Sequence, residues 1–128
     1  MFANFLSLNI VLTPCDEKIS AQSPEYAEIM LFLRRHILDH SKHIAETFKY
    51  MTLYYEYKGK GICFMHLKDD YVYLGFYSRG KLKHPKLHAE GRKVIKLFKC
   101  FINKNVDVRS LNSILKEACK IAEQKVKS

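Results

Sequence analysis

Apolar side chains recur at helical spacing near both ends of the chain. Ser23 can cap a first helix, with Pro24 at the first helical position, where its missing N–H costs nothing. The pattern therefore predicts a helix from residue 24 to about residue 39. It rests on residues at the i, i+3, i+4, i+7 and i+11 positions of one helix face: Tyr26, Ile29, Met30, Leu33 and Ile37.

The sequence predicts two further helical segments and an N-terminal arm. Ser41 can cap a short helical turn over residues 44–48. Asp107 is the expected N-cap of a closing helix with the same spacing of apolar residues from Leu111 to Ala122. The first 22 residues show no clear periodicity, so we expect residues 1–22 to form an arm and residues 23–126 to form one domain.

Between these helices, aromatic and β-branched runs separated by turn signals predict a sheet. Residues 51–57, 62–68 and 71–77 read as three consecutive strands, joined by turns at residues 58–61 and 69–70. Residues 93–101 are expected to form a fourth strand. Residues 71–77 are apolar on both alternating faces, which predicts a strand inside the sheet. The fold class is therefore α+β: an antiparallel sheet of about four strands, a meander plus one, with N-terminal and C-terminal helices packed on it.

Composition and charge add a candidate function to this fold. The chain has 128 residues, of which 48% are hydrophobic, enough for one core. Its net charge of +9 is uneven: residues 1–57 carry five basic and seven acidic side chains, whereas residues 58–128 carry seventeen and six. Residues 79–104, the basic region, hold nine basic residues and one acid, Glu90. This local excess predicts an anionic partner: a small molecule, a nucleic acid or an acidic protein.

The expected anion site lies in the basic region. Arg79, Lys81, Arg92 and Lys93 would hold the anion through charge-assisted hydrogen bonds. Three strand tyrosines could form pocket walls: Tyr55, Tyr73 and Tyr77. The alternative is a solvated loop followed by an edge strand whose lysines prevent aggregation.

The strand tyrosines can also be interpreted in two ways. Rings interleaved with basic residues on a sheet resemble the stacking platform of single-stranded nucleic-acid binding proteins. Aromatic residues of a sheet more often pack against a helix, and core packing is the favoured reading. The residues concerned are Tyr54, Tyr55, Tyr57, Tyr71, Tyr73 and Tyr77.

The sequence favours a non-catalytic binding module over an enzyme. It contains no nucleophile elbow, zinc-binding histidine pair with glutamate, or phosphate-cradling glycine loop. His36 and His40 are weak candidates for a metal site, because the helix is expected to end near Asp39 and to separate them from His43. Four widely spaced cysteines are expected to be reduced thiols of a cytoplasmic protein. No apolar run approaches the ~18 residues that span a bilayer, so no membrane partner is expected.

An ordered series of short motifs resembles the YdhG-like bacterial domains. The resemblance covers residues 23–123 and rests on Glu46-x-x-Lys49-Tyr50, Tyr54-Tyr55-Glu56-Tyr57-Lys58-Gly59-Lys60, Ile62-Cys63-Phe64, Val72-Tyr73-Leu74-Gly75-Phe76, Gly80-x-Leu82, Glu90-Gly91-Arg92-Lys93 and Leu115-Lys116-Glu117-Ala118. The family has no established function, and Leu53 stands where many relatives carry proline.

The resemblance implies an α+β domain in the cytoplasm, which we expect to be a monomer or a weak homodimer. We expect no cofactor. Some family members are described as frataxin-like iron chaperones, so the resemblance alone makes iron possible. The net charge of +9 opposes capture of a cation. Iron binding is therefore the first alternative to anion binding. An enzyme that uses a cleft between sheet and helices, with His66 and tyrosine hydroxyls, is the second.

Overall fold

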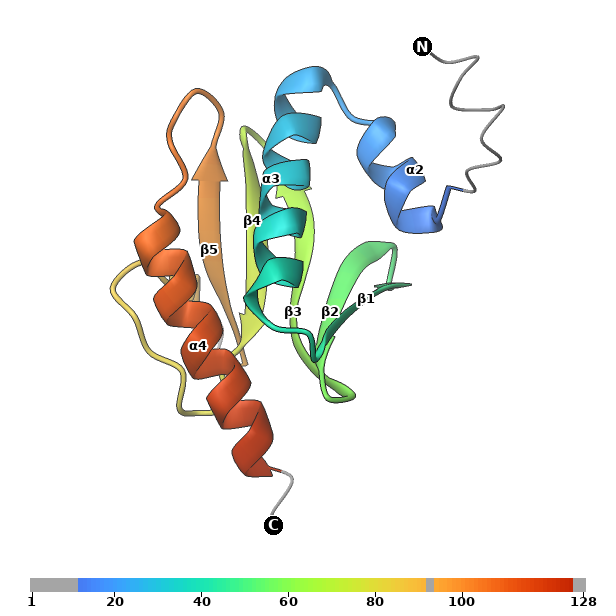
Figure 1. Ribbon diagram of the computed structural model, residues 1–128. Coiled ribbons are helices and arrows are strands. Elements are labelled where there is room, and N and C mark those ends of the chain that lie inside the picture. The colour runs from blue at the N-terminus through green and yellow to red at the C-terminus, as the bar shows by residue number, and fades with distance from the viewer. Residues whose placement is uncertain (1–11, 92–93, 126–128) are drawn as a thin grey trace.

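Residues 12–91 and 94–125 are described by a computed structural model (Figure 1). They form one five-stranded antiparallel sheet and three helices. The helices are α2 (Pro14–Ser20), α3 (Pro24–His40) and α4 (Val108–Lys125). The strands are neighbours in chain order: β1 (Ile44–Lys49), β2 (Thr52–Tyr57), β3 (Lys60–Lys68), β4 (Tyr71–Tyr77) and β5 (Ile95–Phe101). The predicted α+β class is confirmed, with one strand more than expected.

The additional strand is β1, where the sequence predicted a helical turn. That prediction was wrong. β1 pairs with β2 from Ile44 opposite Tyr57 to Lys49 opposite Thr52, which leaves a two-residue turn. Tyr50 and Met51 form this turn with φ angles of 54° and 62°. Tight turns with two positive φ angles usually contain Asn or Gly, so a Tyr-Met pair gives no turn signal in the sequence.

The other predicted turns and both long helices are confirmed. Lys58 and Gly59, with φ angles of 50° and 84°, connect β2 to β3, and Asp69, with φ of 51°, begins the turn between β3 and β4. α3 starts at Pro24 and ends at His40. α4 follows Asp107, whose carboxylate accepts a hydrogen bond from the Ser110 N–H at 3.1 Å, as expected of an N-cap.

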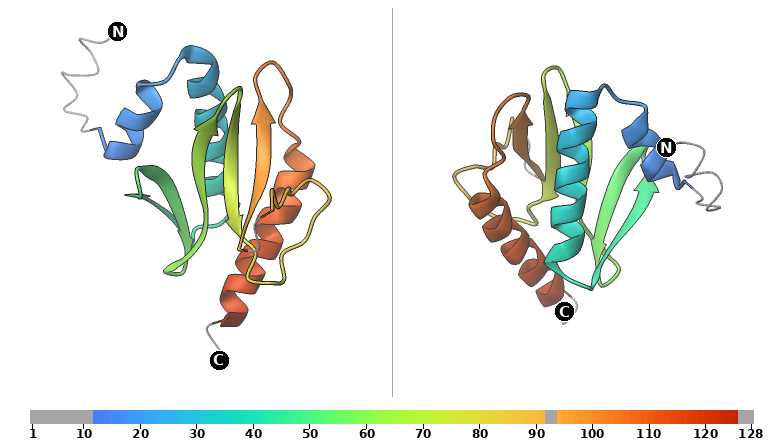
Figure 2. Two further views of the ribbon diagram at one scale, coloured as in Figure 1. Left: turned by 180° about the vertical axis from the view of Figure 1, so that it is seen from behind. Right: turned by 45° about the horizontal axis from the view of Figure 1, so that its top comes forward.

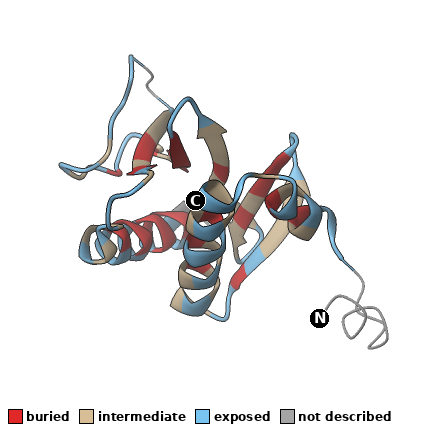
Figure 3. Cartoon of the chain, turned by 90° about the horizontal axis from the view of Figure 1, so that it is seen from above, coloured by how far each residue is buried: buried red, intermediate tan, exposed pale blue. Residues whose placement is uncertain are grey.

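The sheet has two faces that are covered differently. α3 and α4 pack on one of them, the inner face (Figures 1 and 2). Seen from behind (Figure 2, left), the strands lie in front of α3 and α4, and this side is the outer face. Buried segments lie on the strands and on the sides of the helices turned toward them (Figure 3). The fully buried side chains of this core include Met30, Leu33, Met65, Leu74, Phe76 and Ile114.

Part of the segment predicted as an arm is helical. Thr13 caps α2 in a capping box with Asp16: the Thr13 hydroxyl accepts from the Asp16 N–H, and the Asp16 carboxylate accepts from the Thr13 N–H. Cys15 and Ile19 of α2 are buried in the core. Only two apolar positions face the core in seven residues, too few for periodicity to reveal a helix in the sequence.

Candidate functional site

The basic region occupies both ends of strands β4 and β5. Arg79 and Lys81 follow Tyr77 at one end, whereas Tyr71, at the other end of β4, lies opposite Phe101. At about 3.4 Å per residue, seven strand residues separate these ends by about 20 Å. The two other predicted anion ligands, Arg92 and Lys93, lie outside the described residues.

At the first end, Arg79 lies against an aromatic ring. Its guanidinium carbon is 5.7 Å from the ring centroid of Tyr77. Lys81 is exposed, and its backbone N–H donates a hydrogen bond to the Ser78 carbonyl at 2.8 Å. Partial burial raises the pKa of the Tyr77 hydroxyl, which therefore remains protonated at neutral pH. Arg79 and Tyr77, which the sequence assigned to one site, are neighbours.

At the second end, a cavity of about 220 Å³ opens at the edge of β5. Lys99 is one of the residues that line this cavity. Its ammonium lies over the ring of Tyr71 and donates a hydrogen bond to the Glu90 carboxylate at 3.1 Å. Hydrogen bonds of 2.8 and 2.9 Å between the His88 and Leu97 backbones hold the loop beside the strand. The polar and aromatic residues that line the cavity include Lys86, His88, Lys99, Phe101, Lys104 and Asp107.

The lysines of β5 are divided between the faces, as their odd spacing predicts. Lys96 lies opposite Phe76 on the inner face, and its ammonium donates to the Leu82 carbonyl at 2.9 Å. Lys99 lies opposite Tyr73 on the outer face. Lys96 therefore satisfies a buried backbone group, and Lys99 is the lysine of this strand that a ligand on the outer face can reach.

The three tyrosines predicted as pocket walls do not line one pocket. Tyr73 and Tyr77 are on the outer face, whereas Tyr55 is fully buried on the inner face. The Tyr55 hydroxyl donates to the Glu46 carboxylate at 2.8 Å. Burial raises the pKa of Tyr55.

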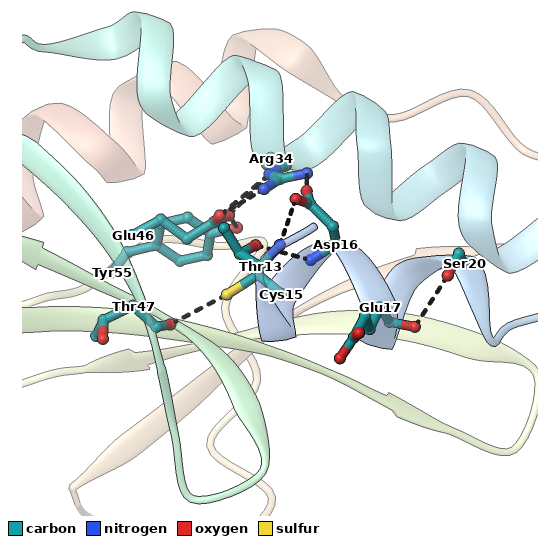
Figure 4. Close-up of polar contacts among 9 residues, drawn as sticks. All are labelled: Thr13, Cys15, Asp16, Glu17, Ser20, Arg34, Glu46, Thr47 and Tyr55. Carbon is teal, nitrogen blue, oxygen red and sulfur yellow. Dashed lines mark hydrogen bonds and ion pairs between the residues drawn. The ribbon is translucent and has the colours of Figure 1, made fainter. Parts of the chain in front are cut away.

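Glu46 belongs to a polar cluster that the sequence did not reveal (Figure 4). Arg34 of α3 makes three hydrogen bonds to the Glu46 carboxylate of β1, at 2.8, 3.0 and 3.1 Å, and an ion pair of 2.7 Å with Asp16 of α2. The Cys15 thiol donates to the Thr47 carbonyl at 3.4 Å. The Arg34 guanidinium therefore joins α2, α3 and β1 through Asp16 and Glu46.

The cysteines have the environment of structural thiols. All four are buried and free. Burial raises the pKa of Cys15 and Cys119 to about 11 and that of Cys100 to about 12, and it raises the pKa of Cys63 as well. Because the thiolate is the nucleophile, these groups are not activated for nucleophilic chemistry at neutral pH.

Aromatic rings form a continuous series on the outer face, which we call the aromatic row. Its successive ring centroids are 5.2 to 6.3 Å apart. Four of the six strand tyrosines belong to it, and its phenylalanines were not among the predicted site residues. The row consists of Tyr50, Tyr54, Tyr77, Phe64, Tyr73, Tyr71 and Phe101.

Cations lie over rings along this row. Lys49 is 5.2 Å from the ring centroid of Tyr54, and Lys99 is 5.1 Å from that of Tyr71. Lys104 is 5.9 Å from that of Phe101. With Arg79 over Tyr77, cations lie near both ends of the row and beside its middle. Lys49 lies far from the basic region in sequence, so only strand pairing brings it to this surface.

The histidines considered for metal binding have other partners. The His36 Nε2 is 2.5 Å from the Asn112 side-chain oxygen. α3 ends at His40, where burial and the nearby His36 lower the pKa of the His40 imidazole. His43 lies beyond the helix, with its ring edge toward Tyr57. In residues 12–91 and 94–125, no three His, Cys, Asp or Glu side chains are grouped so as to hold a metal.

His66 is on the outer face, opposite Tyr73, and not between sheet and helices. Its Nδ1 is buried with no hydrogen-bond partner among the described residues. The space between sheet and helices is occupied by buried side chains of the core.

Comparison of the chain with protein-family models, with curated proteins and with solved structures finds no match. Within the described residues, no helix is long and apolar enough to cross a membrane.

Proposed function

We propose that this chain is a non-catalytic binding module for an anionic partner and that it binds through the basic region. The cavity beside β5 is the observation that carries the proposal. Its lining includes three lysines, Lys86, Lys99 and Lys104, and a single acid, Asp107. Flexible lysine side chains that line one recess are suited to binding a phosphate or carboxylate.

The size of the cavity defines what it can hold. Pockets that enclose a drug-sized ligand usually measure about 300–1,000 Å³, and this cavity measures about 220 Å³. It can therefore take one charged group of a partner that extends over the neighbouring surface. On the outer face, Arg79 at the other end of β4 offers a further contact. A cytoplasmic YdhG-like domain, monomeric or weakly dimeric, remains part of this proposal.

A titration with anions tests the proposal. Heparin and inorganic pyrophosphate are added to the full chain in a calorimeter at about 50 and 200 mM salt. We expect heparin to bind and its affinity to fall as salt rises, because bound cations release counterions from the polyanion. Absence of salt-sensitive binding to heparin would overturn the proposal.

A pair of charge-matched variants locates the site. Lys86→Glu/Lys104→Glu changes the cavity, and Lys116→Glu/Lys120→Glu makes the same change in net charge on exposed positions of α4. The cavity variant is expected to weaken heparin binding at least tenfold more than the α4 variant. Equal losses would mean that only net charge matters, and a site at the cavity would be wrong.

A further inference from the structure

The outer face combines exposed rings with cations, and this combination selects one kind of anion. We propose that the partner is single-stranded nucleic acid, whose bases stack on the aromatic row while its phosphates meet the cations beside it. The inference rests on the proposed function and names the partner of the same surface. It also extends that surface beyond the basic region to β2 and β3.

The central rings of the row form an accessible patch. Tyr54, Phe64 and Tyr77 come from three adjacent strands and are each partly exposed. The ring of Tyr77 is 6.3 Å from that of Tyr54 and 6.2 Å from that of Phe64. Tyr71 and Tyr73, by contrast, are buried in a small cluster with Leu97. A base can therefore reach these three rings more easily than the rings of Tyr71 and Tyr73.

Two glycines make room for the rings of this patch. Gly75 lies directly opposite Phe64, and a Cβ atom at Gly75 would overlap the Phe64 ring. A Cβ atom at Gly61 would overlap the hydroxyl end of Tyr54 in the same way. Each ring thus reaches across the neighbouring strand, into space that a side chain would otherwise fill. Glycine at both positions therefore leaves room for the rings of Tyr54 and Phe64 to lie along the sheet, as rings do on a stacking platform.

Positive charge borders the patch on two sides. Arg79 lies over Tyr77, and Lys49 lies over Tyr54. Lys49 is paired with Glu56 at 3.0 Å, whereas Arg79 has no ion pair with a described residue. Lys99 and Lys104 continue the charge to the cavity at the edge of β5. From β2 to β5 the sheet spans about 15 Å, so a short segment of nucleic acid can contact rings and cations together.

The hairpin tip next to the patch supports the same partner. Tyr50 is 82% exposed and its ring is 6.0 Å from that of Tyr54, so it extends the row into solvent. Its positive φ is a conformation that favours glycine or asparagine. An exposed aromatic ring in a strained turn adds little to the core and offers a further face for a base.

These observations favour single-stranded nucleic acid over the two other anionic partners. An acidic protein would use the cations but would have no need of successive ring faces. Duplex nucleic acid presents phosphates while its base faces are stacked inside the helix. Unpaired bases of any sequence can stack on aromatic rings, so we expect weak sequence preference.

The test compares strands that differ only in their bases. Labelled twelve-residue oligodeoxythymidine, an abasic phosphodiester of the same length and a twelve-base-pair duplex are titrated with the full chain, and affinity is read by fluorescence anisotropy. The thymidine strand is expected to bind at least tenfold more tightly than the abasic strand and the duplex. The chain has eight tyrosines and no tryptophan, so stacking should also quench its tyrosine emission directly.

Each outcome decides between the two proposals. Equal affinity for the thymidine and abasic strands, or preference for the duplex, would overturn base stacking and leave anion binding in place. Failure of both strands and of heparin to bind would overturn both proposals. Because these comparisons use the unaltered chain, they do not depend on the folding of any variant.

Two matched pairs of variants then identify the residues. Tyr77→Leu keeps an apolar side chain but removes the ring, and we expect a roughly five- to hundredfold loss of thymidine-strand affinity with little change for the abasic strand. Tyr57→Leu, away from the aromatic row, is its control. Arg79→Ala should reduce the salt slope by about 1, whereas Arg109→Ala on α4 should leave it unchanged. Melting temperatures show whether each variant is folded, and equal effects in both members of a pair would contradict the assignment.

Discussion

The inner and outer faces of the sheet are built from alternate residues of the same strands, but they use aromatic rings differently. On the inner face, Phe76 is completely buried beneath the helices. On the outer face, Phe64 is partly exposed and touches mainly Tyr73 and Tyr77. The inner rings stabilise the fold through area removed from water. On the outer face, the rings of Tyr54, Phe64 and Tyr77 retain accessible area, and this is what makes them available to a ligand.

The two faces also treat charge differently. On the inner side, the Arg34 guanidinium is saturated by Glu46 and Asp16, and all three groups are mostly shielded. On the outer side, Arg79 and Lys104 lie over rings and have no ion pair with a described residue. Ion pairs on the inner side hold helices and strands together. Cations that lie over rings can exchange the contact with the ring for a contact with a phosphate.

The largest effect should come from shortening one phenylalanine on each face. Phe76→Ala is expected to cost about 4 kcal/mol of unfolding free energy, because it leaves a cavity in the packed core. Phe64→Ala should cost less than half as much, since solvent can fill the space of a partly exposed ring. Urea denaturation of both variants measures the difference. Equal costs would mean that the outer face is as well packed as the inner one.

The next effect concerns the guanidinium that joins three elements. Arg34→Met should cost about 2 kcal/mol, because it leaves the Glu46 carboxylate, only 11% exposed, without its cation. Arg35→Met is the control one residue further along α3. Arg35 is 85% exposed and 3.7 Å from Asp39, and the loss of such a surface pair should cost less than about 0.5 kcal/mol. Similar melting temperatures for the two variants would contradict a structural role for the cluster.

Most of the fold follows from local patterns, but this cluster does not. The helical spacing from Tyr26 to Ile37 and the turn signal at Gly59 act within a few residues, so α3 and the hairpin could be predicted. Arg34 and Glu46 are twelve residues apart, and their contact depends on how a helix packs over a strand that was itself mispredicted. A short helix such as α2 has too few core positions to be recognised.

The candidate site, too, has features that local patterns predict and features that they do not. Uneven charge led to the basic region, and period-two alternation places Tyr73 and Tyr77 on one face of β4. That Tyr55 lies on the opposite face depends on register between strands, and a shift in the β2–β3 pairing after Tyr55 makes simple extrapolation from the turn unreliable. Lys49 was missed because its strand, β1, was predicted to be a helical turn. Charge and alternation can be read from neighbouring residues in the sequence, whereas the identity of cross-strand neighbours cannot.

A smaller effect should appear at the hairpin tip beside the outer face. Tyr50→Asn/Met51→Gly gives the turn residues suited to its two positive φ angles. We expect a gain of about 1 kcal/mol in unfolding free energy, since the strain of two non-glycine residues is relieved. Thermal and urea denaturation measure it. The inner face is unaffected by this change, so a loss of stability would show that the exposed Tyr50 ring contributes to packing.

The smallest effect should be a pH dependence that originates on the outer face. Burial lowers the pKa of the His66 imidazole, and the positive charge of Lys18 adds to the shift. The unfolded chain, with a histidine pKa near 6.5, therefore binds the proton at higher pH than the folded chain. The stability contribution of neutral His66 is complete above about pH 6.5 and declines as the pH falls through 6.5 toward the folded value.

His66→Phe should remove this part of the pH dependence, and it also replaces a ring nitrogen that has no hydrogen-bond partner among the described residues. The measurement is the unfolding free energy in urea at pH 7.5, 6.5 and 5.5. Because burial lowers the pKa of His40 as well, a residual slope of the same sign should persist, and His40→Gln added to His66→Phe should reduce it further. If His66→Phe alone leaves the slope between pH 7.5 and 5.5 unchanged, His66 titrates as it does in the unfolded chain. The outer face would then be more open to water around His66 than the buried Nδ1 indicates.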